Sequence, residues 1–257
     1  MNDKMLLDVA VLAGEIMLSS GAETYRVEDT MDHILKKGNK DTVESFALMT
    51  GIVATVNDRS MDTPLTVMRT VNRRSTNLSN IMKVNEISRR YCKDKITLEE
   101  AWEQLQGVNQ KQYRRTFYNL AMAGVSAGFV MMFGGTAWDV LVGAVVGLLL
   151  GLIVTATKIG RLNAIIADIL SGAGISLATL LMNRLVMGVL NTDIIIISSM
   201  MSIVPGVAIT NAIRDTLHGD YLSGSARILE AFVKAASIAL GVGTGLTIFS
   251  MLLGGGL

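Results

Sequence analysis

The chain has 257 residues, half of them apolar, and a formal net charge of only +1. This length allows one or two domains, and the near-zero charge gives no overall field that would attract nucleic acid. The single cysteine, Cys92, excludes an intrachain disulfide and a zinc site made of several thiolates.

The N-terminal segment is expected to be helical. Residues 3–19 place their apolar side chains on one face, and a second helix is expected over 24–38. Asp3, Asp8 and Glu15 make this segment unlike a signal peptide. We therefore expect the N-terminus to stay in the cytoplasm.

Strand-forming and helix-forming segments follow one another up to about residue 110. Residues 45–57 and 64–72 are rich in β-formers and predict a β-hairpin. Helices are expected at 78–91 and 98–105. The sequence thus predicts a small cytoplasmic α+β domain over residues 1–110.

The composition changes sharply near residue 115. Residues 1–115 hold 17 of the 23 Lys and Arg, whereas residues 116–257 hold 20 of the 25 Gly. A spanning helix needs about 20 mostly apolar residues. Buried soluble helices are the alternative, but they seldom supply such uncharged runs in succession. We expect a transmembrane α-helical domain over 111–257 with five helices, near 116–138, 140–157, 162–183, 194–211 and 230–257.

Basic residues predict the orientation of these helices, because Lys and Arg favour cytoplasmic loops. They precede the first helix and occupy the loops after the second and fourth, at positions 111, 114, 115, 158, 161, 214 and 227. The opposite loops carry only Arg184. The N-terminal domain is therefore expected in the cytoplasm and the C-terminus outside.

Glycines recur at every fourth position in the apolar segments. Gly143, Gly147 and Gly151 form one such stripe, and Gly124 and Gly128 form another. Small residues at this spacing let two helices approach closely. Packing within the chain explains most of them. Their density also favours a homo- or hetero-oligomer with a partner membrane subunit.

Few ionisable groups enter the apolar segments, and each is a candidate functional residue. Asp168 is either neutral or paired with Lys158 or Arg161, or it is a proton or amine site. Pro205 and Gly206 either kink a helix or break it, and a broken helix exposes backbone dipoles that can hold a substrate.

Polar residues crowd the segment after Pro205. Asn211, Arg214 and Asp215 would lie together on a continuing helix. Arg227, Glu230 and Lys234 form a second set. Such groups are either an anchor at the membrane surface or the mouth of a pathway. Arginine can hold a carboxylate with two parallel bonds.

No catalytic or cofactor-binding constellation is found. His33 and His218 are the only histidines, which leaves no histidine metal triad, and no nucleotide fingerprint is present. We expect neither a metal nor another cofactor, and not an enzyme. Arg73–Arg74 and Arg89–Arg90 could touch anionic lipid or form a solvated face.

Two segments together resemble the threonine/serine exporter family. The first runs from Ser20 to Glu28 and contains Gly21, Thr24, Arg26 and Glu28. The second contains, in order, Pro205-Gly206, Asn211 to Asp215, Gly219-Asp220, Ser223-Gly224, Ala226-Arg227 and Glu230-Ala231. The similarity spans essentially the whole chain.

The resemblance implies a multi-pass protein of the bacterial plasma (inner) membrane that exports threonine and serine, or succinate as some split pairs do. Full-length members carry a second, smaller membrane module. This sequence ends at Leu257, so the expected arrangement is a split one, with a separate small membrane protein as partner.

The expected mechanism assigns roles to the polar residues. Asn211, Arg214 and Asp215 would gate the inner mouth, Arg214 or Arg227 would bind the substrate carboxylate, and Asp168 would sense a proton or the substrate amine. Export would be coupled to proton entry. Two alternatives remain: a passive channel, and a scaffold or regulatory subunit whose partner holds the substrate site.

Overall fold

The computed structural model describes residues 3–72, 74–108 and 114–253, and the chain divides into two compact units. The first combines Met1–Gln110 with Gly206–Leu229, and the second combines Lys111–Pro205 with Glu230–Leu257. The expected domains, 1–110 and 111–257, thus differ from this division at 206–229. Expectations for Arg73, Lys111 and residues 254–257 fall outside the described residues.

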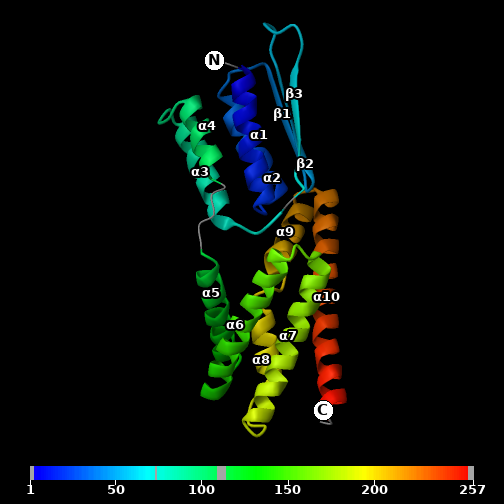
Figure 1. Cartoon of the computed structure of the whole chain (residues 1–257). Helices are drawn as coiled ribbons and strands as arrows, with labels where there is room; N and C mark the ends of the chain where they lie inside the picture. The colour runs from blue at the N-terminus through cyan, green and yellow to red at the C-terminus, as the bar shows by residue number, and fades with distance from the viewer. Residues whose placement is uncertain (1–2, 73, 109–113, 254–257) are drawn as a thin grey trace. The chain divides into compact units, whose positions relative to one another are not determined.

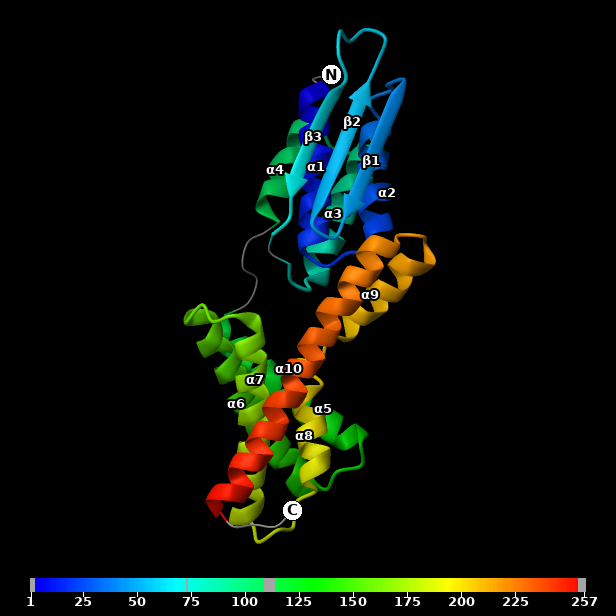
Figure 2. The same cartoon turned by 90° about the vertical axis from the view of Figure 1, so that its right-hand side faces the viewer.

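The first unit is layered, with a sheet, a central helix pair and an outer helix pair (Figure 1). Figure 2 shows the strands side by side across α1 and α2. The elements are α1 (Asp3–Ser19), α2 (Thr24–Lys36), β1 (Thr42–Leu48), β2 (Gly51–Asn57), β3 (Leu65–Thr70), α3 (Leu78–Cys92) and α4 (Leu98–Gly107).

Helix α1 forms the middle layer of this unit. It lies beside α2 and packs against the sheet on one side and against α3 and α4 on the other (Figure 2). Leu6, Ala10, Ala13 and Met17 are fully buried, which explains why α1 is apolar around much of its circumference. The hydrophobic effect therefore places the core of the unit around α1.

The sheet has three antiparallel strands in the order β1-β2-β3, rather than the two expected. A turn at Met49 and Thr50 divides the segment 45–57, so that Leu48 pairs with Gly51. Neither turn residue is a typical turn former, so the sequence pattern did not reveal this break. Alternate β2 residues are buried, as expected for a strand with one face on a core.

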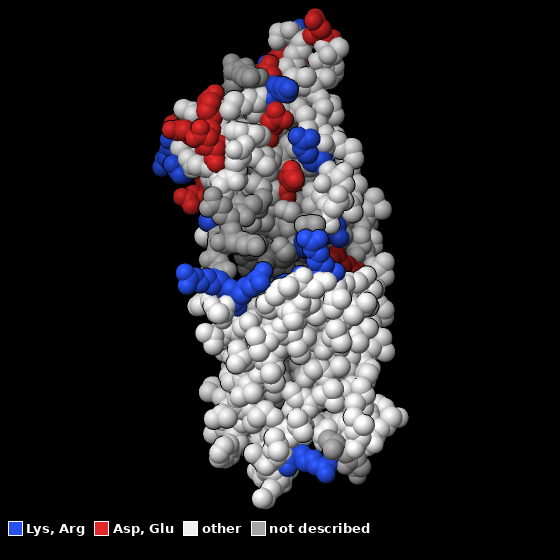
Figure 3. All heavy atoms as spheres, in the orientation of Figure 1, with Lys and Arg blue, Asp and Glu red and all other residues white. Residues whose placement is uncertain are grey.

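The second unit is helical. It contains α5 (Arg115–Met132), α6 (Ala137–Ile159), α7 (Ala164–Leu185), α8 (Thr192–Met200) and the larger part of α10 (Tyr221–Leu253). Among the described residues, three helices are long and apolar enough to cross a membrane: α6, α7 and α10. Lys, Arg, Asp and Glu are absent from most of the visible face of this unit (Figure 3). The expected class, an α+β domain followed by a membrane helical region, is confirmed.

The fourth expected span, 194–211, is not one helix. Helix α8 ends at Met200, and α9 (Gly206–Leu217) starts directly after Pro205 and belongs to the first unit. Proline lacks the N–H that a continuing helix needs and crowds the preceding turn. With nine residues, α8 is also shorter than the roughly 20 residues of a spanning helix.

The last helix begins at Tyr221 rather than near residue 230. Asp220 provides the reason, because its Oδ1 accepts a hydrogen bond from the Ser223 N–H at 3.0 Å. A carboxylate at this position satisfies one of the free N–H groups of the first turn. The α9–α10 hairpin therefore turns at Gly219, whose φ is 89°.

Close helix contacts in the second unit depend on glycine. A Cβ on Gly147 would lie 2.7 Å from the Met122 carbonyl oxygen of α5. A Cβ on Gly172 of α7 would lie 2.5 Å from the Ile238 carbonyl oxygen of α10. In contrast, a Cβ on Gly124 or Gly128 would meet no atom of the described residues within 4 Å. The two stripes expected from the sequence thus differ: one is packed and the other is open.

Candidate functional site

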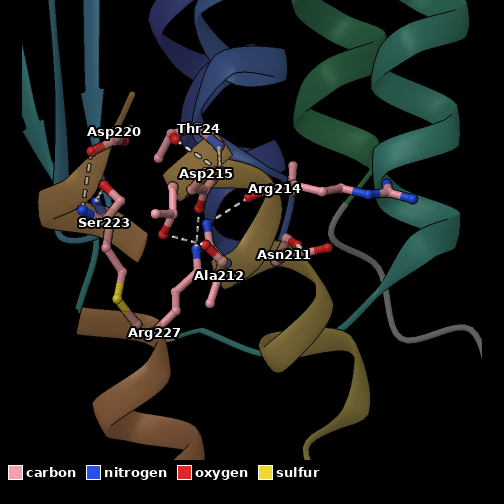
Figure 4. A network of polar contacts seen from close by, with 12 residues as sticks. Thr24, Asn211, Ala212, Arg214, Asp215, Asp220, Ser223 and Arg227 are labelled. Carbon is pink, nitrogen blue, oxygen red and sulfur yellow. Dashed lines mark hydrogen bonds and ion pairs between the residues drawn. The ribbon is translucent and has the colours of Figure 1, made fainter. Parts of the chain in front are cut away.

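The two sequence segments that carry the family resemblance meet in the first unit. The turn between α1 and α2 contacts α9 and the first turns of α10, although the segments are about 190 residues apart in the chain. Figure 4 shows the side chains of this polar network, with Asp215 between Thr24 and Arg227.

The turn after α1 is set by Gly21. Its φ of 84° lies in the left-handed region that glycine adopts without strain. The Gly21 N–H donates to the Leu18 oxygen at 3.1 Å and the Ala22 N–H to the Met17 oxygen at 3.0 Å. This pattern is a Schellman cap. It leaves the carbonyl groups of Gly21 and Ala22 to bond elsewhere.

Both carbonyl oxygens accept hydrogen bonds from the α9–α10 hairpin. Asn211 Nδ2 donates to the Gly21 oxygen at 2.7 Å, and Arg227 Nη2 donates to the Ala22 oxygen at 2.7 Å. A buried carbonyl without a partner costs about as much as a lost hydrogen bond. Asn211 and Arg227 therefore stabilise the α1–α2 turn directly.

Asp215 caps the start of α2 from another part of the chain. Its Oδ1 accepts from the Thr24 N–H at 3.1 Å and from Thr24 Oγ1 at 3.0 Å. The first N–H groups of a helix lack internal partners, and the helix dipole favours a negative charge there. Glu23, the residue that precedes α2, makes no side-chain cap of its own. The Asp215 carboxylate takes this role.

Arg227 neutralises the other side of Asp215. Arg227 Nε lies 2.8 Å from Asp215 Oδ2, and only 6% and 0% of the two side chains are exposed. Burial raises the pKa of Asp215, although the Arg227 charge and the hydrogen bonds from Thr24 oppose the shift. The pair thus lies in a desolvated setting where charge interactions are strong.

Glu23 joins two arginines at the edge of the network. Its Oε1 accepts from Arg214 Nη1 at 2.7 Å, and its Oε2 lies 3.5 Å from Arg26 Nη1. Burial alone would raise the pKa of Glu23, but its backbone hydrogen bond and the two arginines lower it. The Arg214 side chain is 54% exposed, whereas the Glu23 side chain is 6% exposed.

The network also reaches the sheet. The Met49 N–H in the β1–β2 turn donates to Ser223 Oγ at 3.2 Å, and the Ala47 N–H donates to Glu28 Oε1 at 2.8 Å. Burial, followed by the charges of Asp220, Asp32 and Asp215, raises the pKa of Glu28. The expected motif residues Gly21, Thr24, Arg26 and Glu28 therefore all have specific contacts.

In this network some polar side chains are buried and bonded within the chain, whereas others are partly exposed to solvent. Arg227 Nη2 and Asn211 Nδ2 donate to carbonyl oxygens of the chain, so these residues hold the hairpin on the α1–α2 turn. Arg214 contacts Glu23 yet is half exposed. Arg214 is therefore the most exposed arginine of this network, followed by Arg26 at 41%. Among the described residues, no cluster of three His, Cys, Asp or Glu could hold a metal ion.

Asp168 lies in the second unit and pairs there with Lys234. The Lys234 Nζ donates to Asp168 Oδ1 at 2.6 Å, joining α7 to α10. The expected partners, Lys158 and Arg161, are wrong. Lys158 instead lies 5.1 Å from the centre of the Tyr118 ring. Because Gly172 lets α7 and α10 approach closely, the Lys234 side chain reaches Asp168.

Three other candidates lie at the sequence boundaries between the two units. Pro205 and Glu230 belong to the second unit, and Gly206 is the first residue of α9. The break at Pro205 therefore separates an apolar helix from a polar one, and the residues that follow Gly206 contribute the network. Whether the break lies near a transport pathway stays a prediction.

Sequence reasoning missed several contact residues. Glu23 and Ser223 stood inside the motif segments but were not singled out. Lys234 was expected beside Arg227 and Glu230, and its pairing with Asp168 was not expected. Asp139 of α6 is fully buried and accepts from the Asn191 N–H at 2.9 Å. The capping spacing of Thr136 and Asp139 was a usable signal for a helix start.

Residues 8–249 match the family described as "Putative threonine/serine exporter". A protein of Mycobacterium tuberculosis described as a "Probable threonine/serine exporter" is 25% identical over 254 residues. The match covers 94% of this chain but 46% of that relative, so the chain spans about half of the relative's length. No solved structure matches the chain.

Proposed function

The chain belongs to the threonine/serine exporter family, and we propose that it exports threonine, serine or a related small carboxylate such as succinate. It is a membrane protein with several candidate spans, and membership of a transporter family implies that it is not an enzyme. The observation that carries the proposal is the polar network, in which the two motif segments meet around one half-exposed arginine, Arg214.

Arg214 is the proposed group that attracts the substrate carboxylate. Its guanidinium already holds the carboxylate of Glu23 at 2.7 Å, so the local geometry suits this chemistry. A substrate carboxylate would replace Glu23 on Arg214 during transport. Glu23 would then keep its contact with Arg26, 3.5 Å away, so that the displaced charge stays compensated.

Asn211, Asp215 and Arg227 are proposed to gate rather than to bind. Their polar atoms hold the α9–α10 hairpin on the α1–α2 turn. Release of these contacts would free the hairpin, and re-formation would return it. Pro205, directly before α9, and Gly206, its first residue, would provide the point at which the chain bends.

Proton coupling is proposed to use Asp168. In α7 and α10 this carboxylate and Lys234 form a pair inside candidate spans, where an isolated charge is costly. Protonation of Asp168 would release Lys234. A switch of this kind provides a way to use proton entry to drive export, or to sense the amine of the substrate.

The proposed topology has the N-terminal unit in the cytoplasm and the C-terminus outside. Arg114 and Arg115 at the start of α5, together with Lys158 and Arg161 around the α6–α7 turn, support it. Transport is proposed to require a separate small membrane protein. The relative contains about as much chain again outside the matched part, which leaves room for a further module in that protein.

Labelled efflux tests the proposal. Cells that carry the chain with the small membrane protein are loaded with labelled serine, threonine or succinate, and efflux is compared with cells that carry either protein alone. We expect efflux of at least one substrate only from the pair. Arg214→Ala should abolish it at equal membrane abundance, whereas Arg59→Ala, whose parent side chain is 96% exposed, should not. Unchanged efflux in Arg214→Ala would remove the proposed role of that residue.

A scaffold or regulatory subunit is the second candidate, because most polar atoms of the network are used by the chain itself. In that case the partner would hold the substrate site. Binding of labelled serine to the purified chain, with and without the partner, separates the two functions. Counterflow in vesicles then distinguishes a carrier, which exchanges substrate across the membrane, from a passive channel.

A further inference from the structure

A basic groove lies beside α2 and α3 in the first unit, away from the buried part of the polar network. Its volume is about 550 Å³. Five cationic side chains line it, Arg26, Arg89, Arg90, Lys93 and Lys95, with one carboxylate, Glu86. An excess of one charge sign in a concave surface attracts and concentrates ligands of the opposite sign.

The helical spacing explains how α3 builds one wall. Met82, Glu86, Arg89 and Lys93 follow one another at steps of three or four residues, so they share one side of the helix and its end. Arg26 is contributed by α2. The groove is thus a product of two helices that are distant in sequence but packed together.

Arg26 has a carboxylate partner, Glu23, but most of the other cations have no carboxylate partner among the described residues. Arg90 Nη1 donates to the neutral Gln104 Oε1 at 3.2 Å. Within the part of the chain that the structure describes, the side chains of Arg89, Lys93 and Lys95 make no ion pair or hydrogen bond, and all three residues are exposed. Their charge is therefore available to a ligand.

An apolar strip lies within the same groove. Leu78 and Met82 are 64% and 63% exposed, and Ile81 is buried behind them. Exposed apolar side chains beside convergent charged groups are typical of a ligand site. A simple inorganic ion would leave this strip uncovered. An anion with an apolar part would bury it.

We propose that this groove binds a ligand that carries a phosphate and an apolar group. Several uncompensated cations suit the double charge and the three oxygens of a phosphate better than a single carboxylate, and arginine binds phosphate oxygens in pairs. The ligand is either a soluble phosphorylated compound or a lipid phosphate. This site differs from the one proposed for the exported substrate.

Arg26 connects this groove to Glu23. Its Nη1 lies 3.5 Å from Glu23 Oε2, while Arg214 holds Glu23 Oε1. A phosphate that draws Arg26 into the groove leaves Glu23 with Arg214 alone. Occupancy of the groove is therefore expected to strengthen the contact between Glu23 and Arg214 and so to regulate the hairpin.

Calorimetry on the full-length chain in phosphatidylcholine nanodiscs tests the proposal. Adenosine monophosphate represents the soluble source, dihexanoyl phosphatidic acid the lipid source, and inorganic phosphate the charge alone. We expect saturable binding of at least one of the first two, tighter than that of inorganic phosphate. The member that binds identifies the source.

The variants locate the site. The double variant Arg89→Gln/Lys93→Gln should weaken binding at least about tenfold, because each removes a charge-assisted contact. Met82→Ser should weaken it less and should not change the affinity for inorganic phosphate. Lys83→Gln on the same helix, outside the lining residues, is the matched control and should leave the affinity unchanged.

The proposal is overturned if neither organic probe binds below millimolar concentrations. It is also overturned if Lys83→Gln weakens binding as much as the double variant, which would show attraction to general positive charge. Thermal unfolding without ligand confirms that each variant is folded. Because the readout is binding, its failure leaves the proposed transport function untouched.

Discussion

Arg227 and Asp215 form an ion pair that is closed to solvent. Arg227 Nε lies 2.8 Å from Asp215 Oδ2, with 6% and 0% of the side chains exposed. Neither of these two atoms has a hydrogen-bond partner, so this contact is held by charge. Asp215 Oδ1 and Arg227 Nη2 bond to Thr24 and to the Ala22 carbonyl oxygen. One pair thus joins α9, α10 and the start of α2.

Arg227→Met is expected to destabilise the first unit strongly. It leaves Asp215 buried and uncompensated, and breaking a buried pair typically costs about 3–5 kcal/mol. Adding Asp215→Asn should recover much of the loss, because no buried charge then remains. Denaturant unfolding of the detergent-solubilised variants measures both changes. The idea fails if the double variant is as unstable as Arg227→Met.

Arg214→Ala, unlike Arg227→Met, should change the stability little but should reduce efflux. The side chain is 54% exposed, and exposed ion pairs contribute only about 0–1 kcal/mol. Stability should therefore change little, whereas efflux should fall at least about tenfold if Arg214 binds the substrate carboxylate. Efflux at equal membrane abundance is the measurement. A loss of efflux that follows only a loss of folded protein would argue against a role in binding.

The Asp168–Lys234 pair can be tested by exchanging the two charges. Asp168→Leu leaves Lys234, whose side chain is 35% exposed, without its partner among apolar helices, and an unpaired charge inside a membrane segment is costly. We expect lower membrane abundance. The double variant Asp168→Lys/Lys234→Asp should restore abundance but not efflux, since the protonatable group has moved to α10. Full recovery of efflux would show that the pair is only structural.

Gly241 and Gly243 form a matched pair of positions on α10. A Cβ on Gly241 would collide with the carbonyl oxygen of Ile169 in α7, whereas a Cβ on Gly243 would meet no described atom within 4 Å. Gly241→Ala should therefore separate α7 from α10 and lower the melting temperature, and overpacking typically costs about 1–3 kcal/mol. Gly243→Ala should be neutral. Equal melting temperatures would contradict this packing.

Glu28 should give the first unit a defined pH dependence. Burial and the nearby acids raise its pKa above the usual 4.5, so the folded state binds the proton more tightly than the unfolded state. The resulting stability is fully present below pH 4.5 and is lost as the pH rises through the raised value. Glu28→Gln keeps the oxygen that accepts from the Ala47 N–H. It should raise the melting temperature at pH 7.5 and flatten its dependence on pH.

Asp29→Gln is a control for Glu28→Gln on the same helix, since Asp29 is exposed. It should leave the pH dependence of the melting temperature in place. A profile for Glu28→Gln that is parallel to that of the unchanged protein would show that another group is responsible.

Sequence patterns predicted most elements of the fold, because each depends on local periodicity. The helices expected in residues 1–110 lie close to the observed α1, α2, α3 and α4. The apolar segments expected near 140–157 and 162–183 lie close to α6 and α7. The features that the patterns missed are breaks inside segments whose composition does not change. The turn at Met49 divides a segment that is rich in β-formers throughout, and α9 is separated from α8 at Pro205.

The amino-acid sequence alone was enough to identify the class of the chain and its family, because composition and the spacing of motifs can be read directly along the chain. Folding decided which charges meet. Thr24 and Asp215, or Asp168 and Lys234, are joined only when helices distant in sequence pack together. The physical reason is that a buried charge needs a partner within a few ångströms, and such distances are created by tertiary packing.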